Sequence, residues 1–194
     1  MILESWPWKR QLLRDADIIE RWVQKKPSER RRFTIEQKIF LSAYSMRKLF
    51  DGQKFSSSFG ERVLKCTVYP PLGKRITIAN NHRLDELYDL HSPSSKNISA
   101  TILLNLIIHS FIFFEVVDDG LTLQSFFVTS DQSRQQGLWQ ITLAEFTRLM
   151  RIVGNDMPSR YIRVFDKKQG DWFIWQGDGD PPKHIAEKIK RLKE

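Results

Sequence analysis

The stretch 97–130, NISATILLNLIIHSFIFFEVVDDGLTLQSFFVTS, constrains the fold most because it is the most hydrophobic part of the chain. We expect a short buried helix over 98–110, followed directly by a β-hairpin over 111–129 that closes in a two-residue Asp119-Gly120 turn. The first segment is apolar on all sides, so periodicity alone leaves a strand as its alternative. The rest of the chain is expected to pack around this stretch.

The predicted turn also fixes a register for the hairpin. It places Val117 opposite Thr122 and Phe113 opposite Phe126. Because side chains alternate along a strand, one face is then almost entirely apolar and is predicted to be the core face. That face holds Ile112, Phe114, Val116, Leu123 and Phe127, with Ser125 as its polar member. Glu115 lies on the other face near the tip, where we expect water.

Apolar residues recur at three- and four-residue spacing over 8–24, 34–50 and 143–153, which predicts three more helices. Thr34 and Thr142 open the second and third of these with capping-box spacing to Gln37 and Glu145. Alternating segments predict two further hairpins, over 62–79 and 161–175.

The order of these elements lacks the alternation of strand and helix that a doubly wound sheet requires. We therefore predict a single α+β domain, 1–194, with helices packed on a mainly antiparallel, hairpin-built sheet. Within it, 1–33 forms a basic N-terminal helix and linker, 34–175 forms the core, and 182–194 forms a basic C-terminal helix.

The net charge of +8 is concentrated at the two ends of the chain. Residues 1–33 carry nine Lys/Arg against five Asp/Glu, and residues 182–194 carry five against two. Such clusters attract anions, so nucleic acid or an acidic protein is the expected partner. The segment 25–32 is alternatively a solvated linker between two helices. The candidate binding residues are Lys25, Lys26, Arg30, Arg31, Arg32, Lys183, Lys188, Lys190, Arg191 and Lys193.

The last predicted hairpin is unusually aromatic. In its second strand Trp172 and Ile174 point one way, and Phe173 and Trp175 point the other. Aromatics on both faces indicate either a strand covered on both sides or an exposed aromatic surface used for binding. We expect the covered strand.

Several function classes are excluded by motif. The chain has no G-x-x-x-x-G-K-[ST] phosphate loop, dinucleotide fingerprint, H-E-x-x-H or Gly-x-Ser-x-Gly elbow. We predict no cofactor and no metal site, because the single cysteine, Cys66, and the spacing of the histidines provide no ligand set. A cysteine-poor chain whose N-terminus is interrupted by Glu4, Lys9 and Arg10 indicates a cytoplasmic protein without a signal peptide. The apolar run 101–117 is too short and too interrupted for a membrane span.

One local pattern has catalytic character. Asn105 and His109 are four residues apart, so they share one helix face. The motif Asn105-Leu-Ile-Ile-His109 resembles the Arg-Asn-x-x-x-His signature of the HEPN ribonucleases, in which arginine and histidine jointly cleave RNA within an all-helical fold. The resemblance covers about six residues, and Leu104 stands where the family has arginine. It implies an RNA-cleaving site at His109.

The sequence therefore leaves three readings. In the first, which we prefer, the chain is a non-enzymatic binding or scaffold protein that contacts an anionic partner through its basic ends. In the second, it is a small ribonuclease-like hydrolase centred on His109. In the third, it is a structural subunit of a larger complex. The alternative to a catalytic role for Asn105 and His109 is that they are hydrogen-bonded polar residues at the end of a buried helix.

Overall fold

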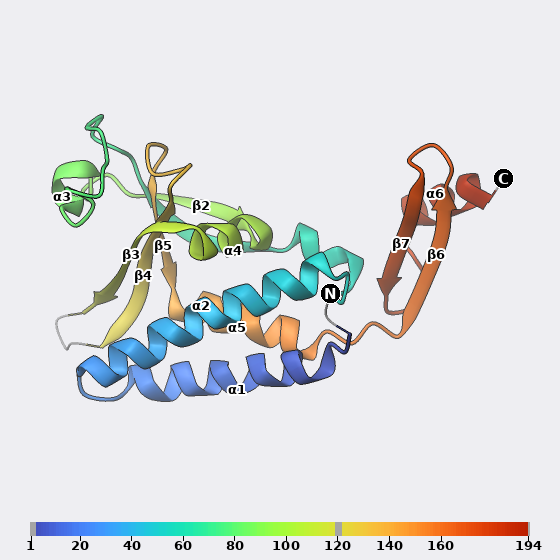
Figure 1. Ribbon diagram of the computed structural model, residues 1–194, viewed down its shortest axis with the longest axis horizontal. Helices are drawn as coiled ribbons and strands as arrows, with labels where there is room; N and C mark the ends of the chain where they lie inside the picture. The colour runs from blue at the N-terminus through green and yellow to red at the C-terminus, as the bar shows by residue number, and fades with distance from the viewer. Residues whose placement is uncertain (1–2, 119–121, 194) are drawn as a thin grey trace.

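The computed structural model, which describes residues 3–118 and 122–193, confirms the predicted α+β fold (Figure 1). The helices are α1 (Trp6–Val23), α2 (Glu29–Asp51), the 3-10 helix η1 (Ser57–Glu61), α3 (Leu84–Leu87), α4 (Ala100–Ile108), α5 (Leu143–Asn155) and α6 (Lys183–Lys193). The strands are β1 (Val63–Tyr69), β2 (Ser94–Ser99), β3 (Ser110–Val117), β4 (Leu123–Ser130), β5 (Leu138–Thr142), β6 (Arg160–Asp166) and β7 (Asp171–Gly177).

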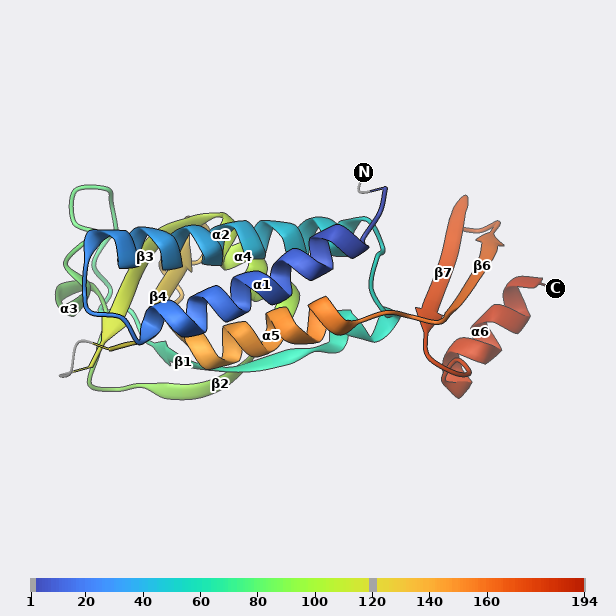
Figure 2. The same ribbon diagram turned by 90° about the horizontal axis from the view of Figure 1, so that it is seen from below.

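Five strands form one antiparallel sheet in the order β2-β1-β5-β4-β3. Helices α1, α2, α4 and α5 cover one face of this sheet, and α1 lies beside both α2 and α5 (Figure 2). The main core fills the space between the layers. At its centre Phe126 of β4 packs edge-on against Phe146 of α5, with 5.9 Å between ring centroids.

The opposite face of the sheet is covered by the segment 70–91, which includes α3. Its side chains form a second, smaller core in which Ile76, Leu87 and Tyr88 pack against Ile112 and Leu138. The buried Tyr88 hydroxyl donates a hydrogen bond to the Arg134 carbonyl at 2.8 Å, which ties this cover to the loop after β4. This face of the sheet is therefore covered in part, around Ile112 and Leu138.

This second cover explains why the predicted hairpin 62–79 is wrong. Only its first strand, β1, exists, and β1 pairs with β2 and β5. The residues expected to form the returning strand, 75–78, instead place Ile76 in the second core. The true partner strand, β2, reads SSKNIS and lacks the apolar alternation by which a strand is recognised in sequence.

The hairpin β3–β4 forms as predicted, but its register is wrong. Phe113 pairs with Val128 and Glu115 with Phe126. The Asp118 N–H donates to the Thr122 carbonyl at 3.0 Å, which leaves three residues between them instead of the predicted two. The predicted turn, Asp119-Gly120, lies outside the described residues.

Over 112–116 the observed pairing differs from the predicted one by two residues, so the same side chains still share a face. The prediction is wrong in which of the two faces meets the main helices. Phe113 and Phe126 lie against the helices, with ring centroids 5.2 Å apart. Phe114, which was predicted to be buried, is 39% exposed. Glu115, expected in water, has a side chain that is only 12% exposed and lies 3.5 Å from the Arg32 guanidinium.

Two helices begin at other residues than predicted. The segment 98–110 is helical only from Ala100, because its first two residues end β2. Helix α2 begins at Glu29, not at Thr34, and the Ser28 hydroxyl caps it by accepting a hydrogen bond from the Arg31 N–H at 3.1 Å. Half of the predicted basic linker is therefore the first turn of α2. The Thr142 cap of α5 is confirmed.

The last elements, β6, β7 and α6, form a unit at one end of the molecule (Figure 1). Its small core consists of Val164, Trp175 and Ile189. Hydrogen bonds attach it to the body, among them one from the Gln176 N–H to the Ser57 hydroxyl at 3.0 Å. The predicted hairpin 161–175 and the basic C-terminal helix are both present.

Among the described residues, no helix combines the length and the apolar character that crossing a bilayer requires.

Candidate functional site

Asn105 and His109 lie side by side on the exposed side of α4, as the spacing predicts. They line a cavity of about 440 Å³ together with Arg47 of α2 and the start of the loop after β4, which contributes Ser130, Asp131 and Gln132. His109 is the C-terminal cap of α4, and its backbone N–H donates to the Asn105 carbonyl at 3.0 Å. The two side chains are thus held by one helix terminus and open to solvent.

The arginine that the Asn-x-x-x-His motif lacks comes from another helix. Arg47 Nη1 donates to Asn105 Oδ1 at 2.9 Å, while Arg47 Nε lies 3.0 Å from Asp51 Oδ1. Leu104, at the motif's arginine position, is fully buried in the main core. Because Arg47 and Asn105 are 58 residues apart in the chain, local spacing carries no signal of their contact.

A carboxylate is also present in this cavity. Asp131 lines it but pairs with Arg134 at 3.2 Å, and the Arg134 guanidinium lies over the Phe111 ring at 4.1 Å. The cavity therefore brings together an arginine, an imidazole and a carboxylate.

The basic residues near the N-terminus form the α1–α2 cluster, which we define as Lys25, Lys26, Arg30, Arg31 and Arg32. Two of these five side chains serve the fold. Arg31 is 4% exposed and donates from Nη1 to the Lys25 carbonyl at 2.9 Å, so it closes the loop between the helices. Arg32 neutralises Glu115 of β3.

The remaining cations of the α1–α2 cluster are exposed, but two of them are held on an aromatic ring. Lys25 Nζ lies 4.0 Å from the centroid of Trp22, and the Arg30 guanidinium lies 5.6 Å from the same ring. Such contacts stabilise the loop by about 0.5–1 kcal/mol each at exposed sites. The cluster is therefore a cap of the helix pair as much as a charged surface.

Glu115 gives this end of the molecule its unusual electrostatics. Burial raises the pKa of the Glu115 carboxyl, and the Arg32 and Arg31 guanidinium groups oppose that shift. One of its oxygens, Oε1, is buried without a hydrogen-bond partner. An ionised carboxylate in this buried place costs free energy. The Arg31 and Arg32 guanidinium groups offset part of that cost, so two of the five cations face an internal anion.

The cations of α6 are arranged differently. Ile185, Ile189 and Leu192 turn one stripe of the helix toward the hairpin. The five basic side chains are exposed on the remaining circumference, and they are Lys183, Lys188, Lys190, Arg191 and Lys193. Lys188 Nζ lies 4.2 Å from the Phe173 ring centroid, which fixes one of them above the hairpin. The helix presents its charge outward.

The two basic ends do not form one surface. The turn between α1 and α2 lies at one extreme of the molecule, and α6 lies at the other (Figures 1 and 2). A single short ligand cannot contact both.

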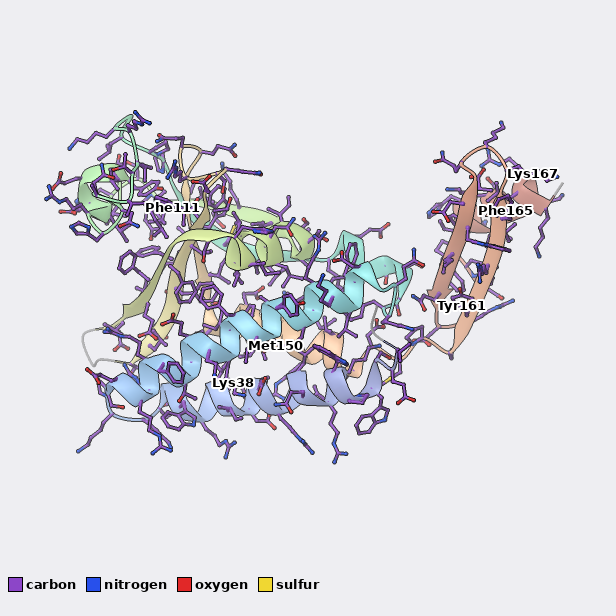
Figure 3. The ribbon with its side chains drawn as sticks, in the orientation of Figure 1. Lys38, Phe111, Met150, Tyr161, Phe165 and Lys167 are labelled. Atoms are coloured by element: carbon purple, nitrogen blue, oxygen red, sulfur yellow. The ribbon has the colours of Figure 1, made fainter. Side chains whose placement is uncertain are left out.

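The hairpin β6–β7 shows both alternatives that its aromatic sequence leaves open. Trp175 is 5% exposed and belongs to the core under α6, as expected of a covered strand. On the opposite face Trp172 is 44% exposed, so the prediction that the strand is covered on both faces is wrong. Tyr161 and Phe165 of β6 lie on that same face, and Lys167 follows at the tip (Figure 3).

A groove of about 980 Å³ runs between α1 and α5 over the ends of β4 and β5. Arg148 and Arg151 line it, but Arg151 is paired with Asp17 and Glu20, and Arg148 with Glu145. Arg151 joins α5 to α1, whereas Arg148 pairs within α5, so the charges that line the groove are engaged. Among the described residues, no group of three His, Cys, Asp or Glu side chains is placed to hold a metal ion.

No protein-family model, curated protein or solved structure matches the chain.

Proposed function

We propose that the protein binds nucleic acid without acting on it chemically, and that its C-terminal unit makes the contact. The observation that carries the proposal is the arrangement of α6, in which one apolar stripe is docked and five exposed cations cover the rest of the helix. Cations on a rigid helix gain phosphate contacts without first giving up internal partners.

The charge balance of this unit supports an anionic polymer as the ligand. Residues 160–194 carry nine Lys/Arg against six Asp/Glu. Two of those acids are engaged within the unit, since Asp178 accepts hydrogen bonds from Ser159 and Asp180 pairs with Arg160. The outward potential therefore comes mainly from lysine and arginine.

The proposal places the protein in the cytosol, where nucleic acid is accessible. The one cysteine, Cys66, supports this location, because it is buried and free and burial raises the pKa of its thiol. An inert buried thiol is typical of proteins from a reducing compartment.

The test is a binding titration of the full chain with fluorescently labelled DNA and RNA oligonucleotides at 50, 100 and 200 mM salt. We expect affinity to fall about tenfold or more across this range, because released counterions make phosphate contacts salt-dependent. The absence of binding at the lowest salt would refute the proposal. Tighter binding to poly-glutamate than to either nucleic acid would assign the surface to an acidic protein instead.

A second function, RNA cleavage at His109, is favoured by one specific observation. Arg47 contacts Asn105 at 2.9 Å in the same cavity and so supplies the cation that the motif lacks. In this proposal the His109 imidazole accepts the proton of an RNA 2′-hydroxyl, which attacks the adjacent phosphorus. The 5′-oxygen leaves and takes a proton from solvent, a cyclic phosphate remains, and Arg47 stabilises the charge on the phosphate oxygens.

This second function is tested by incubating labelled RNA with the wild type, His109→Ala and Arg47→Lys. Both side chains are at least partly exposed, so neither change should unfold the protein. We expect cleavage to fall about 100-fold or more in His109→Ala. Cleavage that persists unchanged in this variant, or that is absent from the wild type, would remove the site from consideration.

A further inference from the structure

The two faces of the β6–β7 hairpin have different environments. The strands pair in the register Val164 with Phe173 and Phe165 with Trp172. Side chains alternate along each strand, so the first pair faces α6 and the second pair faces away. The small core under α6 is complete without the second face.

That second face is aromatic and open. Tyr161 is 56% exposed, Phe165 is 43% exposed and Trp172 is 44% exposed. Three large rings on one side of a two-stranded sheet contribute little to folding and cost solubility, which is the usual mark of an interaction surface. We call these three residues together with Arg163 the aromatic platform.

Arg163 adds a cation to the rings. Its guanidinium lies over the Trp172 ring at 3.7 Å, and Trp172 in turn meets Phe165 edge-on with 5.3 Å between centroids. A guanidinium stacked on indole keeps its outer N–H groups available for phosphate. Ring and cation are thus set side by side before any ligand arrives.

The acidic residues of the hairpin do not oppose an anion at the platform. Asp166 Oδ1 accepts hydrogen bonds from the backbone N–H groups of Lys168 and Gln169, and Asp171 Oδ1 accepts one from Trp172 N–H. Both carboxylates are therefore engaged with the turn. Lys167 and Lys168 at the tip remain exposed beside the platform.

We propose that the aromatic platform binds single-stranded nucleic acid, with bases stacked on Trp172, Phe165 and Tyr161 and a phosphate held by Arg163. This inference rests on the proposed function and names its ligand more closely. In a duplex the base faces are already stacked on one another, whereas a single strand offers them to protein rings. Arg163 and the exposed Lys167 and Lys168 supply the charge complementarity that such a strand requires.

The test compares single-stranded DNA, single-stranded RNA and duplex DNA of equal length in binding titrations of the full chain. The wild type should bind a single strand more tightly than the duplex. Trp172→Ala should lower single-strand affinity by about tenfold, because stacking contributes on the order of 1–3 kcal/mol per base. Trp172→Phe, which retains a ring, should restore most of the loss, and Trp172→Leu should not.

Phe33→Ala is the matched control, because Phe33 is an exposed ring of α2, at 64% exposure, and lies far from the hairpin. It should leave both affinities unchanged. If Trp172→Ala and Trp172→Leu bind single strands as the wild type does, while charge reversal on α6 still weakens binding, the platform is refuted and the proposed function stands. If the wild type binds no nucleic acid, both are refuted. An equal loss for duplex and single strand in Trp172→Ala would also overturn the preference for single strands.

Discussion

The α1–α2 cluster and α6 have similar sequences but different structural roles. Each places five basic residues within thirteen or fewer positions. In the α1–α2 cluster Arg31 is buried, Arg32 neutralises Glu115, and Lys25 and Arg30 lie over Trp22. In α6 all five cations are exposed, and the helix is held mainly by its apolar stripe, with Lys188 alone of the five placed over an aromatic ring of the hairpin.

A run of basic residues in the sequence does not indicate how many of the cations are accessible to a partner. A cation that holds two elements together must leave its partner before it can bind phosphate, and that costs free energy. A cation on the outer side of a docked helix has no such cost. We therefore assign fold stability to the α1–α2 cluster and ligand binding to α6.

The largest expected effect comes from undocking α6. Ile189→Ala removes the side chain that α6 contributes to the small core with Val164 and Trp175. The C-terminal unit should lose about 2–5 kcal/mol of local stability, as is typical of buried isoleucine truncation. Hydrogen exchange followed by mass spectrometry would detect this as faster exchange in β6 and β7, with the five-stranded sheet unaffected.

Lys190→Ala is the control for that experiment, because Lys190 is the exposed neighbour of Ile189. It should leave the exchange of both strands unchanged. Protection of β6 and β7 that survives Ile189→Ala would mean that the hairpin does not depend on α6.

The next effect is at the other end of the molecule. Arg31→Met should destabilise the protein by about 1.5–3 kcal/mol, because a buried charge-assisted hydrogen bond to the Lys25 carbonyl is lost. The exposed neighbour gives a matched control, and Arg30→Met should change stability by about 1 kcal/mol or less, the size of its contact with Trp22. Urea unfolding measures both. Equal stabilities of the two variants would show that Arg31 is a surface cation like the rest.

A smaller effect, with a defined pH dependence, is expected at Glu115. Burial raises the pKa of this carboxyl in the folded state above its unfolded value of about 4.3. The protonated acid is therefore the form that the fold prefers, and its stabilising contribution is complete below the unfolded pKa and is lost as pH rises through the folded pKa. Glu115→Gln should remove this loss, so its stability relative to the wild type should rise between pH 4 and pH 7.

Glu145 provides a control of opposite sign. The hydrogen bond from Arg148 lowers the pKa of the Glu145 carboxyl, so its contribution is present at neutral pH and lost as pH falls. Glu145→Gln should therefore be less stable than the wild type at pH 7 and approach it in acid. Urea unfolding at pH 4, 5.5 and 7 compares the three proteins. If the free energy of unfolding of Glu115→Gln changes with pH in parallel with that of the wild type, Glu115 does not have a raised pKa in the folded state.

Local patterns predicted the elements better than they predicted which elements meet. Helical periodicity located α1, α2 and α5, and the Thr142 cap was read directly from its spacing to Glu145. The partner of β1 was missed because the polar β2 has no alternation to recognise. The register of β3–β4 was missed because the loop is one residue longer than the predicted turn and an irregularity follows between Val116 and Val117. Glu115 was expected in water because strand alternation carries no sign of its contact with Arg32.

The sequence predicted the candidate sites only where local spacing defines them, and it did not predict their contacts with distant elements. The face shared by Asn105 and His109 follows from a four-residue spacing, whereas their neighbour Arg47 comes from another helix. The aromatic sequence of the last hairpin left covered and exposed faces open. Only the docking of α6 on one side decides that Trp175 is buried and Trp172 is open.

We infer that the charge accessible to a nucleic acid resides at α6 and not at the α1–α2 cluster. Two triple variants compare the two ends. Lys190, Arg191 and Lys193 are changed to Glu in one, and Lys25, Lys26 and Arg30 in the other, so both alter the net charge of the protein equally. In titrations with a labelled single-stranded oligonucleotide at several salt concentrations, the α6 variant should bind about tenfold or more weakly and with a shallower salt dependence. The α1–α2 variant should remain within about threefold of the wild type. Equal losses in the two variants, or a larger loss at the α1–α2 cluster, would contradict the account.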